Sequence, residues 1–270
     1  MATPFYTCTL KEVKHSQAKK IRLAEGTRVI PTHWFKNKPK VQVVALPETT
    51  VAIGKGAFEG CVNLVHVDWP GVTHMGDGAF SGCYKLRRAR LPQGMTQVRQ
   101  GVFEDCYGLE AVTLPPALES LGDAAFKRCE SLKRIAIPQG ITALPPEAFA
   151  HCKHLGRVDL PDGLEVIGTR AFESCAMARI DLPQGLTVID DCAFLKCKSL
   201  TEVDIPTSVR TIGKWAFHGC PRIRRVIFHH DPDAVGPWLF NKNTVTVRCV
   251  RGSRMDAYCQ DHGYRTEYAE

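Results

Sequence analysis

The sequence predicts an α/β solenoid: a right-handed coil with a parallel strand ladder on one side and short helical segments on the opposite side. Three recurring residues support this fold class. A phenylalanine returns every 22 or 23 residues, a cysteine follows each of them by three positions, and a proline precedes each by ten or eleven. A fixed period in this range is typical of solenoids, in which each unit buries its apolar face against its neighbours. The recurring residues are Phe58, Phe80, Phe103, Phe126, Phe149, Phe172, Phe194 and Phe217; Cys61, Cys83, Cys106, Cys129, Cys152, Cys175, Cys197 and Cys220; and Pro47, Pro70, Pro92, Pro115, Pro138, Pro161, Pro183 and Pro206.

The first half of each repeat is predicted to be a strand that ends at the proline. The repeat of residues 129–152 serves as an example. Ile135 and Ile137 lie two positions apart and share one face of the strand, while Arg134 lies on the other face. Pro138 ends the strand because it cannot donate the next ladder hydrogen bond. Successive strands joined by such a crossover must run parallel.

The second half of each repeat is expected to contain one or two helical turns. In the segment PPEAFAHC, Pro145 and Pro146 suit the start of a helix. Phe149 and Cys152 follow, three positions apart, so that a helix would place them on one face. The sequence therefore predicts short helices opposite the strand ladder.

The twelve cysteines could suggest a disulfide framework, but the repeat cysteines among them are interpreted as reduced, buried thiols. Eight of them follow the repeat, and free cysteine behaves as a small hydrophobic residue with a weak S–H donor. Equivalent Cβ atoms in stacked strands lie about 4.8 Å apart with parallel vectors. A disulfide requires Cβ atoms about 3.8 Å apart that point toward each other. The redox state of the off-register Cys8, Cys192, Cys249 and Cys259 is left open.

The repeats are expected to form one solenoid of residues 20–249, with an N-terminal cap of residues 1–19 and a helical C-terminal cap of residues 250–270. Within the C-terminal cap, Ser253 can act as the N-cap of a helix that stops at Gly263. Eleven strands are predicted, ending near residues 23, 46, 69, 91, 114, 137, 160, 182, 205, 228 and 249.

Two of the repeats, those that begin at Cys61 and Cys175, are one residue shorter than the others. The first lacks a residue in the turn after its strand, and the second lacks one before its strand. We interpret both as slack in the loops, without a functional role.

A leucine follows most of the repeat cysteines by three positions, which completes an AFxxCxxL segment; these residues are Leu64, Leu86, Leu109, Leu132, Leu155 and Leu200, with Ile223 in the last clear copy. This pattern resembles the leucine-rich repeat family, in particular its bacterial-surface-type (BspA-like) subclass. The resemblance covers roughly residues 20–250. It implies a non-catalytic binding or adhesion protein, since members of this subclass are mostly of that kind and often act at cell surfaces.

The charge and the distribution of apolar residues disfavour several classes of function. The net charge of +7 and the pI of about 8.8 fall short of the strongly basic surface of a dedicated nucleic-acid binder. No apolar run approaches the roughly 18 residues that span a bilayer. The N-terminal segment lacks the apolar core of a secretory signal, which favours a cytoplasmic or non-classically exported protein, although the resembled family is often extracellular. We expect a monomer that needs no cofactor and no metal.

The outward strand positions carry the candidate partner-binding residues. Arginines recur at the first outward position and aspartates at the second, and together they form two columns along the ladder. One interpretation is a self-neutralising, solvated face. The other is that the guanidinium groups bind carboxylates or phosphates of a partner. The candidates are Arg88, Arg134, Arg157, Arg179, Arg225, Asp159, Asp181 and Asp204.

The sequence offers only weak catalytic candidates, so we do not expect an enzyme. His229, His230 and Asp231 are adjacent, and neighbouring side chains on an extended segment point to opposite faces. Cys192 follows two aspartates, which raise a thiol pKa and disfavour a nucleophile. His151 and His154 flank Cys152 but would be scattered by the helical turn, and a solenoid this regular is not expected to hold a deep pocket.

The sequence therefore predicts a non-enzymatic protein-recognition module that uses its strand face. The alternative within binding proteins is a surface adhesin or secreted effector that binds host proteins or glycans. Polyanion or nucleic-acid binding is disfavoured by the aspartates and by the lack of exposed stacking aromatic residues. A hydrolase or redox enzyme built on the histidines or cysteines is the alternative from a different class.

Overall fold

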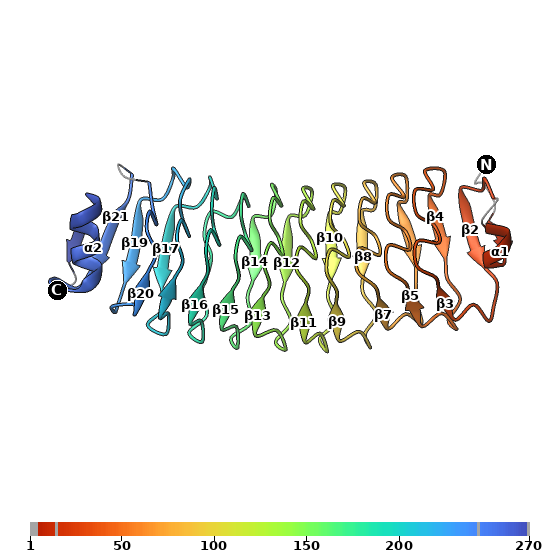
Figure 1. Ribbon diagram of the computed structural model, residues 1–270, viewed down its shortest axis with the longest axis horizontal. Coiled ribbons are helices and arrows are strands. Elements are labelled where there is room, and N and C mark those ends of the chain that lie inside the picture. Colours follow the sequence, from red (N-terminus) through yellow and green to blue (C-terminus); the bar gives the residue numbers. More distant parts are fainter. Residues whose placement is uncertain (1–4, 14–15, 242–243, 269–270) are drawn as a thin grey trace. The chain divides into compact units, whose positions relative to one another are not determined.

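The computed structural model describes residues 5–13, 16–241 and 244–268. The chain forms two compact units, Met1–Leu132 and Lys133–Glu270. Each unit is a parallel-strand solenoid in which one repeat forms one coil (Figure 1). Two sets of strands run along each unit: the face ladder, which contains the predicted strands, and the corner ladder, built from two-residue strands that follow them.

In the first unit, the face ladder consists of β1 (Tyr6–Cys8), β2 (Lys20–Leu23), β4 (Val43–Ala45), β6 (His66–Asp68), β8 (Arg88–Arg90) and β10 (Ala111–Thr113). The corner ladder consists of β3 (Val29–Ile30), β5 (Ala52–Ile53), β7 (His74–Met75), β9 (Gln97–Val98) and β11 (Ser120–Leu121). Helix α1 (Leu10–Val13) lies between β1 and β2 in the sequence. The hydrogen-bonded orders are β1-β2-β4-β6, β8-β10, β3-β5-β7 and β9-β11, so both ladders are interrupted at the same place.

In the second unit, the face ladder consists of β12 (Arg134–Ala136), β14 (Arg157–Asp159), β17 (Glu202–Ile205), β19 (Arg225–Phe228), β21 (Thr246–Cys249) and β22 (Arg265–Tyr268). The corner ladder consists of β13 (Ala143–Leu144), β15 (Val166–Ile167), β16 (Val188–Ile189), β18 (Thr211–Ile212) and β20 (Ala234–Val235). Helix α2 (Arg254–His262) lies between β21 and β22 in the sequence. The corner ladder is continuous here, whereas the face ladder is divided into β12-β14 and β17-β19-β21-β22.

The prediction of parallel strands is confirmed for ten of the eleven expected positions, and the strand expected to end near residue 182 is absent from the structure. That strand falls in the repeat that begins at Cys175, which is one residue short before the strand. The shortened connection leaves Ile180 and Asp181 without a strand hydrogen-bonding pattern. The corner ladder and the terminal strands β1 and β22 were not predicted.

The short helices expected opposite the strands are not found among the described residues, where the only helices are α1 and α2. The segment PPEAFAHC instead forms consecutive turns. Glu147 and His151 have left-handed backbone angles, with φ of 56° and 61°, which no α-helix accommodates. The three-residue spacing of Phe149 and Cys152 predicted a helix, but it also fits the observed turns. These turns close hydrogen bonds over three residues, such as that from Cys152 N–H to the Phe149 carbonyl at 3.2 Å.

Alternate N–H groups of these turns donate to the next coil and form a third set of inter-coil hydrogen bonds, here called the turn ladder. Glu147, Phe149 and His151 donate to the carbonyls of Thr169, Ala171 and Glu173 at 2.8, 2.9 and 2.7 Å. The left-handed residues turn these N–H groups along the solenoid axis. Backbone groups that a helix would pair within the segment are thus paired between coils, which joins each coil to the next.

The recurring phenylalanines form a stacked row in the core of each unit. In the first unit, the ring of Phe103 lies 5.7 Å from that of Phe80 and 5.5 Å from that of Phe126, with interplanar angles of 10° and 9°. In the second unit, the row ends with Phe240, against which Tyr264 packs edge-to-face at 5.6 Å. The predicted core role of the repeat phenylalanines is therefore confirmed.

The eight repeat cysteines are free and buried, as predicted, and the four off-register cysteines, whose redox state was left open, are free and buried as well. The repeat cysteines also form hydrogen bonds: Cys106 Sγ donates to the Phe80 carbonyl at 3.2 Å, and Cys83 Sγ donates to the Phe58 carbonyl at the same distance. Burial raises the pKa of Cys61 to about 11 and raises that of Cys106 further. A thiol suits this position because it is apolar enough for the core and still supplies a donor.

The C-terminal helix agrees with the prediction made from its capping residues. The Ser253 side chain accepts a hydrogen bond from the Asp256 N–H, and Gly263 ends the helix in a left-handed conformation. Asp231 adds a second N-terminal cap, because its carboxylate accepts hydrogen bonds from the N–H groups of Arg254 and Met255 at 2.7 and 2.9 Å. Tyr264 accepts the Phe240 N–H at 3.4 Å and donates to the Phe240 carbonyl at 3.0 Å, which satisfies backbone groups at the end of the row.

Candidate binding surface

The outward positions of the face ladder in the second unit bring arginines together as the sequence predicts. Arg134 on β12 lies opposite Arg157 on β14, and both side chains are exposed. Ile135, the middle residue of β12, points the other way and is buried. The register also places Ala136 opposite Asp159. The first pair of the predicted arginine column therefore exists as two neighbouring guanidinium groups on adjacent strands.

Arg157 is held by the aspartate two positions further along its own strand. Its Nε donates to Asp159 Oδ1 at 2.9 Å, and this hydrogen bond is the main reason that the pKa of Arg157 is raised. Arg134 forms no ion pair with any residue that the structure describes. The pair thus combines one arginine oriented by a carboxylate with one that has no partner of its own.

Arg179 and Asp181 do not continue the columns on a strand, because the face strand is missing from this coil. Both residues are exposed. Asp181 lies instead on the wall of a 360 Å³ cavity together with Asp204 and His229, whose Nε2 is 2.7 Å from Asp204 Oδ1. The repeat that lacks one residue before its strand position thus borders a small cavity lined by two aspartates and a histidine.

Of two further candidates, Arg225 has a partner that the sequence did not reveal, whereas Arg88 has no ion-pair partner among the described residues. Arg225 on β19 donates from one guanidinium nitrogen to both carboxylate oxygens of Glu267, at 3.0 and 3.1 Å. Glu267 belongs to β22, which was not predicted. In the first unit, Arg88 on β8 lies opposite Ala111 on β10 and forms no ion pair within the described part of the chain.

The weak catalytic candidates are separated by the structure. His230 Nε2 contacts the Val209 carbonyl, whereas Asp231 caps α2 and His229 faces Asp204. Burial is the main cause of the raised pKa of Cys192, and Asp191 adds to it, which agrees with the expectation that this thiol is a poor nucleophile. Within residues 5–13, 16–241 and 244–268, no cluster of three His, Cys, Asp or Glu side chains is arranged to hold a metal ion.

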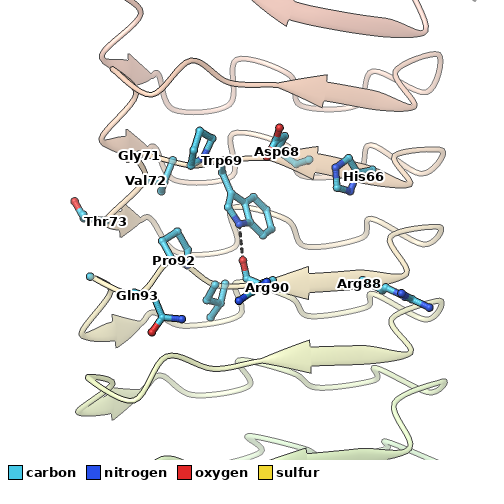
Figure 2. Close-up of a pocket in the computed structure, with 14 residues that line it drawn as sticks. His66, Asp68, Trp69, Gly71, Val72, Thr73, Arg88, Arg90, Pro92 and Gln93 are labelled. Atoms are coloured by element: carbon cyan, nitrogen blue, oxygen red, sulfur yellow. Dashed lines mark hydrogen bonds between the residues drawn. The ribbon is translucent and has the colours of Figure 1, made fainter.

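The largest departure from the sequence analysis is a cavity of about 720 Å³ in the first unit, at the interruption between β6 and β8. A cavity of this volume was not predicted from the sequence, which led us to expect no deep pocket. Figure 2 shows the indole of Trp69 lying between the two strands, with its N–H directed at the carbonyl of Arg90. The signal was present in the sequence, since this is the other repeat that lacks one residue, in the turn Pro70–Gly71–Val72.

No helix in the described residues has both the length and the apolar character required to cross a bilayer. The parallel ladders, the turn ladder and the stacked core define a leucine-rich repeat solenoid. The chain belongs to the BspA type leucine-rich repeat family, whose six-copy repeat-region model matches residues 5–133 and 119–246.

Solved structures of bacterial leucine-rich repeat proteins are similar to this chain. A leucine-rich repeat protein from Bacteroides ovatus ATCC 8483 is 22% identical, with a TM-score of 0.50 over 95% of this chain and 79% of that one. A leucine-rich repeat protein from Eubacterium ventriosum ATCC 27560 is 17% identical, with a TM-score of 0.56 over 86% of this chain and 67% of that one. No curated protein matches the sequence. At these identities the similarity shows the fold alone.

Proposed function

We propose that this protein is a non-enzymatic protein-recognition module whose partner binds the outward side chains of the face ladder. The observation that carries the proposal is the in-register pair of Arg134 and Arg157 on β12 and β14. Two exposed guanidinium groups on neighbouring strands repel each other, so a fold has no stability reason to hold them together. A partner that supplies carboxylates would relieve this repulsion and form charge-assisted hydrogen bonds.

The aspartates of the same face have a supporting role in this proposal. Asp159 holds the Nε of Arg157, which leaves the two terminal nitrogens of that guanidinium for a partner. Arg179 and Asp181 are exposed in the following coil, where they would add one arginine and one aspartate to the partner-binding surface. Arg225 contributes less, because Glu267 already occupies one of its guanidinium nitrogens.

The test is capture of a partner by immobilised protein from lysates of the source cell and of a host. The variant R134A/R157A/R179A should fold normally, because exposed ion pairs add little stability, and should lose the captured partner. A matched control removes three exposed basic groups elsewhere in the same unit, R210A/K214A/R222A, and should retain it. Unchanged capture by the first variant, or equal loss in both, would show that the face arginines do not bind the partner.

Comparison of the two lysates, together with a measurement of heparin binding, separates an adhesin or effector from a polyanion binder. An adhesin or effector would capture a protein or glycan from the host lysate and nothing from its own cell. A polyanion binder would bind heparin with a steep salt dependence, since each phosphate or sulfate contact releases counterions. Arginine-dependent capture of a protein from either lysate supports the recognition function as proposed.

A further inference from the structure

We propose that the cavity between β6 and β8 is a binding pocket for an aromatic side chain flanked by carboxylates, presented by a peptide segment of a protein partner. The proposal rests on the proposed recognition function and names the chemistry of one anchor point within it. The pocket is called the indole pocket below, and its walls come from residues 66–73 and 88–94.

The indole pocket exists because two consecutive coils separate on one side only. β6 does not pair with β8, and β7 does not pair with β9, although each pairs with its other neighbour. The turn ladder remains closed at the same coils, since Phe80 N–H donates to the Val102 carbonyl at 2.9 Å. The opening is therefore a built feature of the strand face, held in place by intact hydrogen bonds behind it.

Trp69 replaces a backbone hydrogen bond of the face ladder. In the preceding coil, Leu46 N–H donates to the Asp68 carbonyl at 2.8 Å, and in the following coil Leu91 N–H donates to the Thr113 carbonyl at 3.0 Å. At the interruption, the equivalent carbonyl is that of Arg90, and it accepts a hydrogen bond from the indole N–H of Trp69 at 2.7 Å instead of from a backbone N–H. The indole also packs edge-to-face on Phe80 at 5.1 Å, so it is a fixed wall rather than a mobile plug.

The walls of the indole pocket favour an apolar group. Trp69, Val72 and Leu91 are buried side chains that line it, and Pro92 completes this part of the wall. A volume of about 720 Å³ lies within the range of pockets that enclose small ligands, and it is larger than one side chain requires. A flat aromatic ring suits such walls, because it brings a large apolar area into the pocket.

The rim of the indole pocket favours negative charge. Arg88, Arg90 and His66 are exposed along it against a single carboxylate, that of Asp68. None of these four side chains forms an ion pair or a side-chain hydrogen bond with another described residue. Figure 2 shows His66 and Arg88 at one end of the pocket and Thr73 and Gln93 at the other. An aromatic residue with acidic neighbours matches both the walls and the rim.

A pocket-filling variant is available without disturbing the backbone. Gly94 lines the pocket, and a Cβ atom added to it would lie 3.6 Å from Thr73 Cγ2, an ordinary van der Waals contact. Gly94 has no left-handed backbone angle, and the equivalent position of the next repeat is Ala117. The substitution Gly94→Leu should therefore fold and place an apolar side chain in the space that a ligand would use.

The test measures binding of the acetylated, amidated tripeptide Asp-Phe-Asp to the full chain by isothermal titration calorimetry. We expect saturable binding that weakens at least tenfold in Gly94→Leu and in R88A/R90A. The control R87A/R99A removes two arginines that pair with Glu110 and Asp77 outside the pocket, and it should bind within twofold of the wild type. The peptides Lys-Phe-Lys and Asp-Ser-Asp should bind at least tenfold more weakly.

The inference is overturned if Asp-Phe-Asp shows no saturable binding up to millimolar concentration, if Gly94→Leu binds it as well as the wild type, or if Lys-Phe-Lys binds equally well. These results are separable from those on the proposed function, which depends on arginines of the second unit. Arginine-dependent partner capture without tripeptide binding would refute the pocket alone. Tripeptide binding without such capture would refute the arginine surface alone.

Discussion

Replacing Phe103 by alanine tests whether the stacked phenylalanine row carries the stability of the solenoid. Phe103 is fully buried, at 0% exposed, and has a stacked ring on each side. Its N–H donates to the Ala125 carbonyl in the turn ladder at 2.9 Å, and this bond does not depend on the side chain. The substitution therefore removes core packing while it leaves the inter-coil hydrogen bonds available.

The expected cost follows from burial and from the two ring contacts. Truncation of a buried phenylalanine to alanine costs about 3–5 kcal/mol, and an aromatic pair contributes about 0.5–1.5 kcal/mol beyond its buried area. Because Phe103 loses two pairs, we expect a loss in the upper half of that range, about 4–5 kcal/mol. Phe103→Leu keeps most of the apolar volume and loses only the stacking, so about 1–2 kcal/mol is expected for it.

The measurement is equilibrium urea unfolding followed by far-UV circular dichroism at 25 °C. Tyr107→Ala is the matched control, because Tyr107 also stacks on an aromatic ring, that of Tyr84 at 4.9 Å, but is 36% exposed. The control should lose less than about 1 kcal/mol. A loss below about 2 kcal/mol for Phe103→Ala, or an equal loss for Tyr107→Ala, would show that the row is not the main source of stability.

Two further predictions concern the buried thiols. Because burial raises the pKa of Cys61 to about 11 and that of Cys259 to about 12, whereas an unfolded thiol ionises near pH 8.5 or so, the unfolded chain releases protons first as the pH rises. The free energy of unfolding should therefore fall between about pH 8.5 and pH 11, by up to about 1.4 kcal/mol per pH unit for each thiol that is ionised only in the unfolded state. The measurement is the urea midpoint as a function of pH. Midpoints that stay constant from pH 8 to pH 10.5 would contradict this prediction. In the native protein at pH 8, an aromatic disulfide reagent should react slowly with the cysteines and then modify all twelve in urea; rapid labelling of most repeat cysteines before denaturation would contradict their burial.

The sequence was sufficient for those parts of the fold that depend on the identity of one residue at one repeat position. The spacing of Phe103 and Cys106 predicted two core positions, and the alternation around Ile135 predicted which side chains point outward. Such positions are readable because a core stack needs the same shape in every coil. For the same reason, the capping helix could be predicted from Ser253 and Gly263, whose roles are local.

The sequence was misleading where one spacing fits two backbone paths. Phe149 and Cys152 lie three positions apart in a helix and in the observed turns alike. The choice was made by the left-handed angles of Glu147 and His151 and by the hydrogen bonds that their N–H groups donate to the next coil. Glutamate and histidine rarely adopt such an angle, but the equivalent positions of an earlier repeat are Gly78 and Gly82, which have positive φ angles as well.

The candidate binding surface was also predicted only in part from the sequence. The sequence by itself determined that Arg134 and Arg157 would face outward on adjacent strands, because a strict repeat converts sequence distance into register. Only the tertiary structure decided that Arg225 pairs with Glu267 and that Arg179 lies off the ladder. It also decided that one missing residue beside Trp69 opens a cavity instead of being absorbed as loop slack. A deletion shortens the chain locally, but whether neighbouring coils close over it depends on hydrogen bonds and side chains that belong to other repeats.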